Sequence, residues 1–317
     1  MKIAAILPCY KSSSKVIDVI KQCLDFVDIV ICVDDQCPEH TGDLIHEHFG
    51  HDSTVKVLKN KTNLGVGGAV KTGIAFLAKD DIDIYIKIDS DGQMDPSLIP
   101  RLIEPIQQGR AQFCKGNRFR DTEIFQRMPL IRLIGNAGLG FITKLSTGYW
   151  ELFDPTNGFL AISQKALEQI KLRKTDNRYF FETDLLLRCA LADIKIEEVP
   201  MSAVYGDEIS SLKPHQELVR FGLKHCFICF KRIGYQYFIL EINPGSFELL
   251  GGLFSGLAAF CIGIQSVLHG MQTGLETPAG TQTLFLALMI LSLQLILGFV
   301  YYDSAFRPLM REIKSRQ

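Results

Sequence analysis

Short apolar runs alternate with helical patterns along the first two thirds of the chain. We predict strands at residues 3–7, 29–33, 55–58, 84–88, 112–115, 158–162 and 194–199. We predict helices at residues 14–26, 67–78, 98–107 and 181–191. This alternation is typical of a mostly parallel sheet with helices on its faces. The pattern therefore predicts an α/β fold up to about residue 213.

The hydropathy pattern changes after residue 246. Residues 247–268 carry one formal charge, Glu248 at their start, and residues 284–302 carry none. Each stretch is long enough to cross ~30 Å of hydrocarbon as a helix. The linker 269–283 has no Lys or Arg, whereas basic residues flank the outer ends: Lys231, Arg232, Arg307, Arg311, Lys314 and Arg316. The positive-inside rule then places both termini in the cytoplasm. A buried hairpin of a soluble domain is the alternative.

The segment before the first span has an amphipathic pattern. Its apolar residues keep roughly helical spacing: Val219, Leu223, Phe227, Phe230 and Tyr237. A second stripe is basic: Arg220, Lys224 and Lys231. Such a helix suits an anionic membrane surface, and a plain surface helix is the alternative. We therefore divide the chain into 1–215, an amphipathic segment 216–245, two spans in 246–303 and a basic tail 304–317.

Composition narrows the classes of partner. The chain has 34 Lys and Arg against 35 Asp and Glu, so its net charge implies no general attraction to nucleic acid. Nine cysteines without framework spacing suggest reduced thiols in a cytosolic catalytic domain.

A glycine-rich loop, NLGVGGAVKTG at residues 63–73, raises the question of a phosphate site. It does not fit a P-loop, because counting from Gly65 puts Val70 where the second glycine must stand. It also misses the last glycine of the dinucleotide fingerprint. What remains is a loop that enters a helix near Gly67 and lets a ligand approach its backbone N–H groups. Close helix packing explains the small residues equally well.

Two acidic pairs stand at strand ends. Asp89 and Asp91 are two residues apart in an extended segment, so both carboxylates can face one divalent cation that bridges a diphosphate. A solvated turn is the alternative. Asp34 and Asp35 could accept hydrogen bonds from a base or ribose, or cap the helix near Thr41.

Seven motifs taken in order resemble family 2 glycosyltransferases. They are LPCYKSS, VDDQCPEHTGDLI, NLGVGGAVKTG, KIDSDGQMDP, DPTNGF, FFETDLLLRC and EVPMSAVYGDEISSLK. The pattern is most similar to the dolichyl-phosphate mannose synthase-like, or polyprenyl-phosphate glycosyltransferase, branch. It covers essentially the whole cytosolic part, and two C-terminal spans fit the membrane-anchored members.

The resemblance implies a GT-A fold, a nucleotide-sugar donor, and Mg²⁺ or Mn²⁺ held by Asp89 and Asp91. By the same match, further residues would contact the donor: Pro8, Tyr10, Asp35, Asn63 and Gly65. The sequence departs from the family at Lys11-Ser12, where Asn-Glu is usual. It also departs at Gln36-Cys37, where Gly-Ser is usual.

The resemblance also implies inversion by a single displacement, with Asp91 at the catalytic centre. The leading acceptor is dolichyl or undecaprenyl phosphate at the cytoplasmic leaflet. The phosphate group of this lipid is already an anion at neutral pH. Three cations are assigned to phosphates: Arg118, which we also count as catalytic, Arg132 and Lys213. Surface ion pairs are the alternative for the two arginines.

A different acceptor would need different residues. A hydroxyl of a lipid-linked glycan requires a base, for which Glu182 or Asp184 is the candidate, although Glu182 could instead brace its helix. A non-catalytic membrane scaffold is a third hypothesis. Glycines in the first span, including Gly251, Gly252 and Gly256, could pack against the second span or against another subunit in a homo-oligomer.

Overall fold

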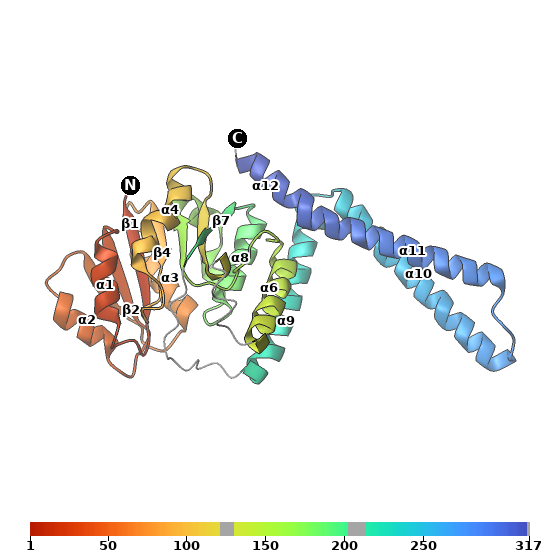
Figure 1. Ribbon diagram of the computed structural model, residues 1–317, viewed down its shortest axis with the longest axis horizontal. Helices are drawn as coiled ribbons and strands as arrows, with labels where there is room; N and C mark the ends of the chain where they lie inside the picture. The colour runs from red at the N-terminus through yellow and green to blue at the C-terminus, as the bar shows by residue number, and fades with distance from the viewer. Residues whose placement is uncertain (121–129, 202–213, 316–317) are drawn as a thin grey trace. The chain divides into compact units, whose positions relative to one another are not determined.

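The computed structural model describes residues 1–120, 130–201 and 214–315 (Figure 1). The chain divides into two compact units. The first, here the catalytic unit, holds residues 1–232 and the C-terminal segment from Arg311. The second, here the hairpin unit, holds Ile233–Met310.

A seven-stranded sheet forms the centre of the catalytic unit. Its strands are β1 (Ile3–Cys9), β2 (Ile29–Asp34), β3 (Val55–Lys59), β4 (Ile84–Lys87), β5 (Phe113–Asn117), β6 (Leu160–Ser163) and β7 (Ile196–Pro200). The order is β3-β2-β1-β4-β6-β5-β7, and β6 alone runs antiparallel to its neighbours. Each predicted strand overlaps an observed one. The predicted α/β fold is confirmed.

Helices cover both faces of this sheet, because successive strand residues point to opposite sides. On one face, Leu7 packs in a core with α1 (Val16–Leu24), α2 (Thr41–Phe49) and α4 (Ile99–Gln107). On the other, Ile6 packs with α3 (Val66–Phe76), α7 (Gln164–Gln169) and α8 (Phe181–Leu191). The Asp95 carboxylate caps the entry to this helical segment, since it accepts from Ser97 N at 2.9 Å before Pro96–Leu98 and α4.

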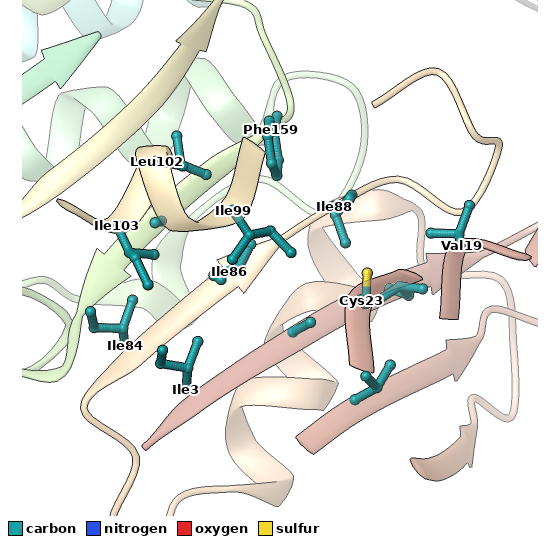
Figure 2. Close-up of a cluster of buried hydrophobic side chains, with 14 of the residues drawn as sticks. Ile3, Val19, Cys23, Ile84, Ile86, Ile88, Ile99, Leu102, Ile103 and Phe159 are labelled. Carbon is teal, nitrogen blue, oxygen red and sulfur yellow. The ribbon is translucent and has the colours of Figure 1, made fainter. Parts of the chain in front are cut away.

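The first core fixes β4, the strand that precedes the acidic pair Asp89 and Asp91. Figure 2 shows Ile84 and Ile86 of β4 against Ile99 and Ile103 of α4, with Ile3 of β1 beside them. All of these side chains are buried. The segment that follows β4 therefore leaves the sheet at a defined place.

The strand order reverses beside β1. From β1 the sheet continues through β2 and β3 on one side and through β4 on the other, and all three pairings are parallel. In open α/β sheets, ligands bind outside the carboxyl ends of strands at such a switch point. The ends of β1, β2 and β4 define that place here.

Two helices at the far end of the sheet pack together: α6 (Leu130–Thr147) and α9 (Pro214–Gly234) (Figure 1). Ser146 Oγ lies 2.8 Å from His225 Nδ1, and the Arg232 guanidinium donates to Leu145 O at 3.0 Å. Our sequence analysis did not predict α6, because its glycines weaken the helical pattern.

Two of the basic residues that flank the spans are not available to lipid. Arg232 is fully buried, and Arg311 is 4% exposed. Arg311 stacks 4.2 Å from the centroid of the Tyr149 ring, and its Nε lies 3.7 Å from an Asp193 carboxylate oxygen. A guanidinium tolerates burial where it stacks on a ring and bonds fixed acceptors. These residues hold chain segments within the catalytic unit.

The hairpin unit consists mainly of α10 (Pro244–Thr273) and α11 (Ala279–Tyr301). The segments Pro244–Thr273 and Ala279–Ile313 are long and apolar enough to cross a membrane, since each contains an 18-residue stretch of high mean hydropathy, 1.8 in the first and 2.4 in the second. A Cβ on Gly252 would lie 2.8 Å from Ile296 Cδ1, and Ser292 Oγ donates to Gly252 O at 2.7 Å. The glycine face of α10 therefore packs against α11.

Tyr237 departs from the predicted amphipathic stripe. It lies in the hairpin unit, where its ring is buried and its hydroxyl donates to Asp303 Oδ1 at 2.7 Å. The exposed stripe on α9 ends at Phe230. Short elements complete the described chain: η2 (Arg118–Arg120), η3 (Leu172–Lys174), η4 (Tyr235–Ile239), η5 (Tyr302–Phe306) and α12 (Arg307–Ser315).

Burial of His225 between α6 and α9 predicts acid sensitivity of the catalytic unit. Burial lowers the pKa of His225 to about 4, from about 6.5 in an unfolded chain. The unfolded state then binds the extra proton between these values, so stability is lost as the pH falls from about 6.5 to about 4. The loss is up to roughly 3 kcal/mol at about 1.4 kcal/mol per pKa unit.

The urea midpoint, followed by fluorescence of the single tryptophan, Trp150, measures this effect. The His225→Leu variant should lack the His225 contribution to the slope between pH 4 and 6.5, whereas His51→Gln, at an exposed site, should keep it. Equal slopes in wild-type and His225→Leu would contradict the assignment.

Candidate functional site

A cavity of about 410 Å³ opens where β1, β2 and β4 end. It brings together all the residues predicted to contact a nucleotide sugar or a metal: Pro8, Tyr10, Asp35, Asn63, Gly65, Asp89 and Asp91. These residues come from four separate segments of sequence. Their individual roles stay predictions.

A serine between the two aspartates ties the strand ends together. Ser90 Oγ lies 2.7 Å from Pro8 O, to which it can donate, and 2.8 Å from Ser12 Oγ. Ser90 is 4% exposed, so these hydrogen bonds are sheltered from water. The link holds the Asp89-Ser90-Asp91 segment beside the end of β1.

The two carboxylates fit a divalent cation that shares its ligands with substrate. Asp89 and Asp91 both line the cavity, and in the described ranges no cluster of three or more His, Cys, Asp or Glu side chains forms a metal site. Mg²⁺ in phosphate-transfer sites takes one or two carboxylates and completes its shell with phosphate and water oxygens. The donor set here matches that arrangement.

A buried lysine lies beneath Asp89. Lys87 Nζ is 2.9 Å from Asp89 Oδ1 and 3.0 Å from Glu182 Oε1, and the lysine side chain is 3% exposed. Burial lowers the pKa of Lys87, but the two carboxylates outweigh burial and leave that pKa above its usual value. Lys87 is therefore an ammonium between two carboxylates.

Asp34 and Asp35 lie in different surroundings. Asp34 accepts from Cys37 N at 2.7 Å and from Gly42 N at 2.9 Å, so it braces the start of α2. Asp35 lines the cavity. The helix-capping interpretation thus applies to Asp34, whereas contact between Asp35 and a donor stays a prediction.

Asp35 also organises the glycine loop. Its carboxylate accepts from Leu64 N at 2.9 Å and from Gly65 N at 2.6 Å. A Cβ on Gly67 would lie 2.5 Å from Asp176 O, so this glycine permits close packing against the segment before α8. The loop is thus tightly packed and also lies at the cavity. Two of its backbone N–H groups already donate to the Asp35 carboxylate.

The two departures from the family pattern contact each other. Lys11 N donates to Cys37 Sγ at 3.1 Å, and Lys11 and Gln36 both have left-handed backbone, with φ of 56° and 57°. Hydrogen bonds to the sulfur, outweighing burial, lower the pKa of the Cys37 thiol. The replaced residues therefore form one local structure at the cavity edge.

The predicted phosphate-binding cations are only partly described. Arg118 pairs with the buried Asp154 through two hydrogen bonds of 2.7 and 3.0 Å. Arg132 falls on α6 in a stretch whose side chains lie outside the described residues, and Lys213 also lies outside them. Their assignment to an acceptor phosphate stays a prediction.

Neither predicted base lines the cavity as described. Glu182 contacts Lys87, as above. Asp184 accepts from Asp176 N at 2.9 Å, and burial raises its pKa. Both carboxylates hold neighbouring segments in place in this structure.

Two residues that line the cavity were not predicted from the sequence. They are Arg178 and Tyr179, which lie in the segment before α8. A buried lysine outside the cavity lining was also not predicted: Lys115, on β5, donates to Asn157 O at 2.6 Å and has a pKa lowered by burial to about 8. A lysine inside an apolar strand was the available signal for Lys87 and Lys115.

Comparison with known proteins identifies the family. Residues 4–171 match the sequence profile described as glycosyl transferase family 2. The chain belongs to this family. It is a glycosyltransferase, as the resemblance implied.

Two relatives in this family share more than half of the chain. A UDP-N-acetylglucosamine–dolichyl-phosphate N-acetylglucosaminyltransferase of Methanococcus voltae is 29% identical over 215 residues, which cover 64% of this chain and 85% of the relative. An undecaprenyl-phosphate mannosyltransferase of Micrococcus luteus is 28% identical over 207 residues, which cover 64% and 84%.

A solved structure supports the GT-A fold. Glucosyl-3-phosphoglycerate synthase of Mycobacterium tuberculosis, crystallised with Mn²⁺, UDP and glucosyl-3-phosphoglycerate, superposes with a TM-score of 0.53. It is 18% identical, and the match covers 74% of this chain and 80% of that one. The likeness concerns the fold.

Two glycines with positive φ, one in the glycine loop and one outside it, give a matched pair of variants. Gly65 lines the cavity with a φ of 89°, and a Cβ there would lie 2.7 Å from Asn177 O. Gly109 has a φ of 70° with nothing within 4 Å of such a Cβ. Gly65→Ala should weaken binding of a nucleoside diphosphate with Mn²⁺ by roughly tenfold or more, because the loop must shift.

Gly109→Ala carries similar backbone strain away from the cavity, so its nucleotide affinity should stay near wild type. Calorimetric titration of both variants measures this difference. Equal affinities in the two variants would contradict the placement of the loop at the nucleotide.

Proposed function

We propose that this glycosyltransferase transfers one sugar from a nucleotide sugar to a polyprenyl phosphate at the cytoplasmic face of a membrane, with inversion at the anomeric carbon. In this proposal residues 1–215 carry the chemistry, residues 246–303 form the membrane anchor and the basic end 304–317 is cytoplasmic. The observation that carries the proposal is the cavity at the switch point. Asp89 and Asp91 line this cavity together with Asp35 and Gly65.

The donor part of the proposal is supported by the shape and charge of that cavity. Its volume of about 410 Å³ lies in the usual range for small-molecule sites. Asp89 and Asp91 would hold Mg²⁺ or Mn²⁺, which when bound stabilises charge on the leaving diphosphate as a Lewis acid. A solved structure of the same fold contains Mn²⁺ and UDP.

The acceptor part is supported by the names of the relatives. Both sequence relatives described above are named as transferases to dolichyl or undecaprenyl phosphate. A phosphate oxygen is already anionic at neutral pH, so it needs cations to position it and no base to activate it. In the proposal Arg118, Arg132 and Lys213 position that phosphate.

A hollow of about 290 Å³ in the catalytic unit suits the first isoprene groups of such a lipid. Phe119, Phe141 and Phe153 line it, and Lys144 Nζ lies 4.9 Å from the centroid of the Phe153 ring. Phe119 directly follows Arg118, so the apolar hollow lies next to a cation assigned to the phosphate. This combination of apolar wall and adjacent cations fits an anionic lipid head.

The exposed face of α9 supports contact with the membrane. Leu223, Phe227 and Phe230 are 69%, 68% and 77% exposed. Large apolar side chains in such a row are costly in water and favourable at a lipid interface. We propose that this face lies in the interface, as the amphipathic pattern of 216–245 suggests.

Transfer assays test the proposal. The purified chain in detergent is mixed with Mg²⁺, a panel of radiolabelled UDP- and GDP-sugars, and a polyprenyl phosphate. One donor should move label into the organic phase, and Asp91→Asn should lower this rate by roughly a hundredfold or more, because a cation ligand is lost. Arg101→Gln, at an exposed site on α4, serves as the control and should keep the rate.

If every donor stays in the aqueous phase while at least one binds, the lipid-phosphate acceptor is wrong. A hydroxyl of a lipid-linked glycan then becomes the acceptor to test.

The position of α9 can be measured by lipid quenching. In a Trp150→Phe background, Phe227→Trp places a single fluorophore on the exposed face of α9, and Phe76→Trp places one on α3, where Phe76 is 48% exposed. Brominated lipids should quench the first variant strongly and the second weakly, because only α9 lies at the acyl boundary. Equal quenching would contradict the proposal.

A further inference from the structure

The buried contact between Lys87 and its two carboxylates bears on how the site works. Lys87 stands at the end of β4, two residues before Asp89. Its ammonium lies 2.9 Å from Asp89 Oδ1 and 3.0 Å from Glu182 Oε1. Asp89 is 32% exposed toward the cavity, whereas Glu182 is 12% exposed.

The surrounding structure leaves the ammonium little room. A Cβ added to Gly158 would lie 2.4 Å from Lys87 Nζ and 2.9 Å from Asp89 Oδ2. Gly158 precedes β6, which pairs with β4, so a loop fixed by the sheet encloses the cluster. Glu182 enters from the first turn of α8. Lys87 therefore links α8, through Glu182, to the Asp89 carboxylate at the cavity.

We infer that Lys87 is a positioning residue that anchors Asp89, and that Glu182 serves this site by holding Lys87 and not by accepting a proton. Glu182 Oε1 is occupied by the ammonium, and Glu182 is not among the described residues that line the cavity. This deepens the proposed function and rests on it, because a transferase without a base at this position needs an acceptor that is already ionised.

The conservative variant separates the two roles. Glu182→Gln keeps an oxygen that accepts from Lys87 but cannot act as a base. An anchoring role predicts a kcat within roughly threefold of wild type and an unchanged pH profile, whereas loss of a general base lowers kcat by about 10²–10⁴-fold. A loss of that size would overturn the inference.

Metal affinity gives a readout that needs no turnover. Titration of the metal-free chain with Mn²⁺ alone, followed by electron paramagnetic resonance, compares Lys87→Met with Glu182→Leu. Lys87→Met removes a positive charge beside Asp89 and should tighten Mn²⁺ binding by roughly threefold or more. Glu182→Leu leaves Asp89 as the one carboxylate that pairs with the Lys87 ammonium, and it should weaken Mn²⁺ binding by roughly threefold or more. Both variants should lower kcat, because each breaks the anchor.

Opposite shifts in affinity with a shared loss of kcat are not expected of general damage to the fold. Lys115→Met is the matched control, since Lys115 is equally buried but donates to the backbone oxygen of Asn157. An equal rise in Mn²⁺ affinity in Lys115→Met would overturn the inference. So would shifts of the same sign in the first two variants.

A double variant covers the case in which Lys87→Met does not fold. Lys87→Met with Glu182→Leu replaces the buried pair by apolar side chains, which is often neutral or stabilising. The urea midpoint should return toward wild type while kcat stays low, because Asp89 still lacks its anchor. Recovery of kcat together with the midpoint would overturn the inference.

Failure of the proposed function would look different. The Mn²⁺ and urea measurements contain no sugar donor or acceptor, so they stand or fall independently of which acceptor the enzyme uses. If polyprenyl phosphate accepts no sugar while the Mn²⁺ shifts have opposite signs, the proposed acceptor is wrong and the anchor is right.

Discussion

The parallel pairing of β1 with both β2 and β4 is the constraint on which the site depends. Because side strands run in the same direction from one central strand, their carboxyl ends meet at one edge. Asp35 follows β2 and Asp89 follows β4, so pairing register alone brings distant acidic residues to one cavity. The buried isoleucines of β4 then fix where that strand ends, and the Ser90 hydrogen bonds fix the turn that follows.

Local signals in the sequence are enough to predict the strands and the place of the acidic pair at a strand end. A strand of alternating faces, an acidic pair at its end and a glycine loop before a helix each follow from short-range rules. The resemblance to a family adds which residues would contact a donor, and the cavity gathers Tyr10, Asn63 and Asp91. These residues are close in space because of topology, which the alternation of elements already implies.

Side-chain pairing could not be predicted in the same way. The sequence analysis assigns Arg118 to a phosphate, but the pairing of Arg118 with Asp154, 36 residues away, depends on tertiary structure. Glu182 reaches Lys87 across 95 residues. The sequence analysis predicts Arg232 and Arg311 as charges that flank the membrane, yet both are buried. Arg311 stacks on the Tyr149 ring, and Arg232 donates to the backbone oxygen of Leu145. Sequence spacing carries no signal for such distant partners.

The bond that the enzyme makes distinguishes a phosphate acceptor from a hydroxyl acceptor. Phosphorus NMR of the lipid product, formed from the productive donor and a polyprenyl phosphate, identifies this bond. If the sugar is transferred to the phosphate, the phosphomonoester resonance of the acceptor is replaced by that of a phosphodiester carrying one sugar. A phosphomonoester resonance that persists while sugar is incorporated into a hydroxyl of a lipid-linked glycan would contradict the proposed transfer to the phosphate.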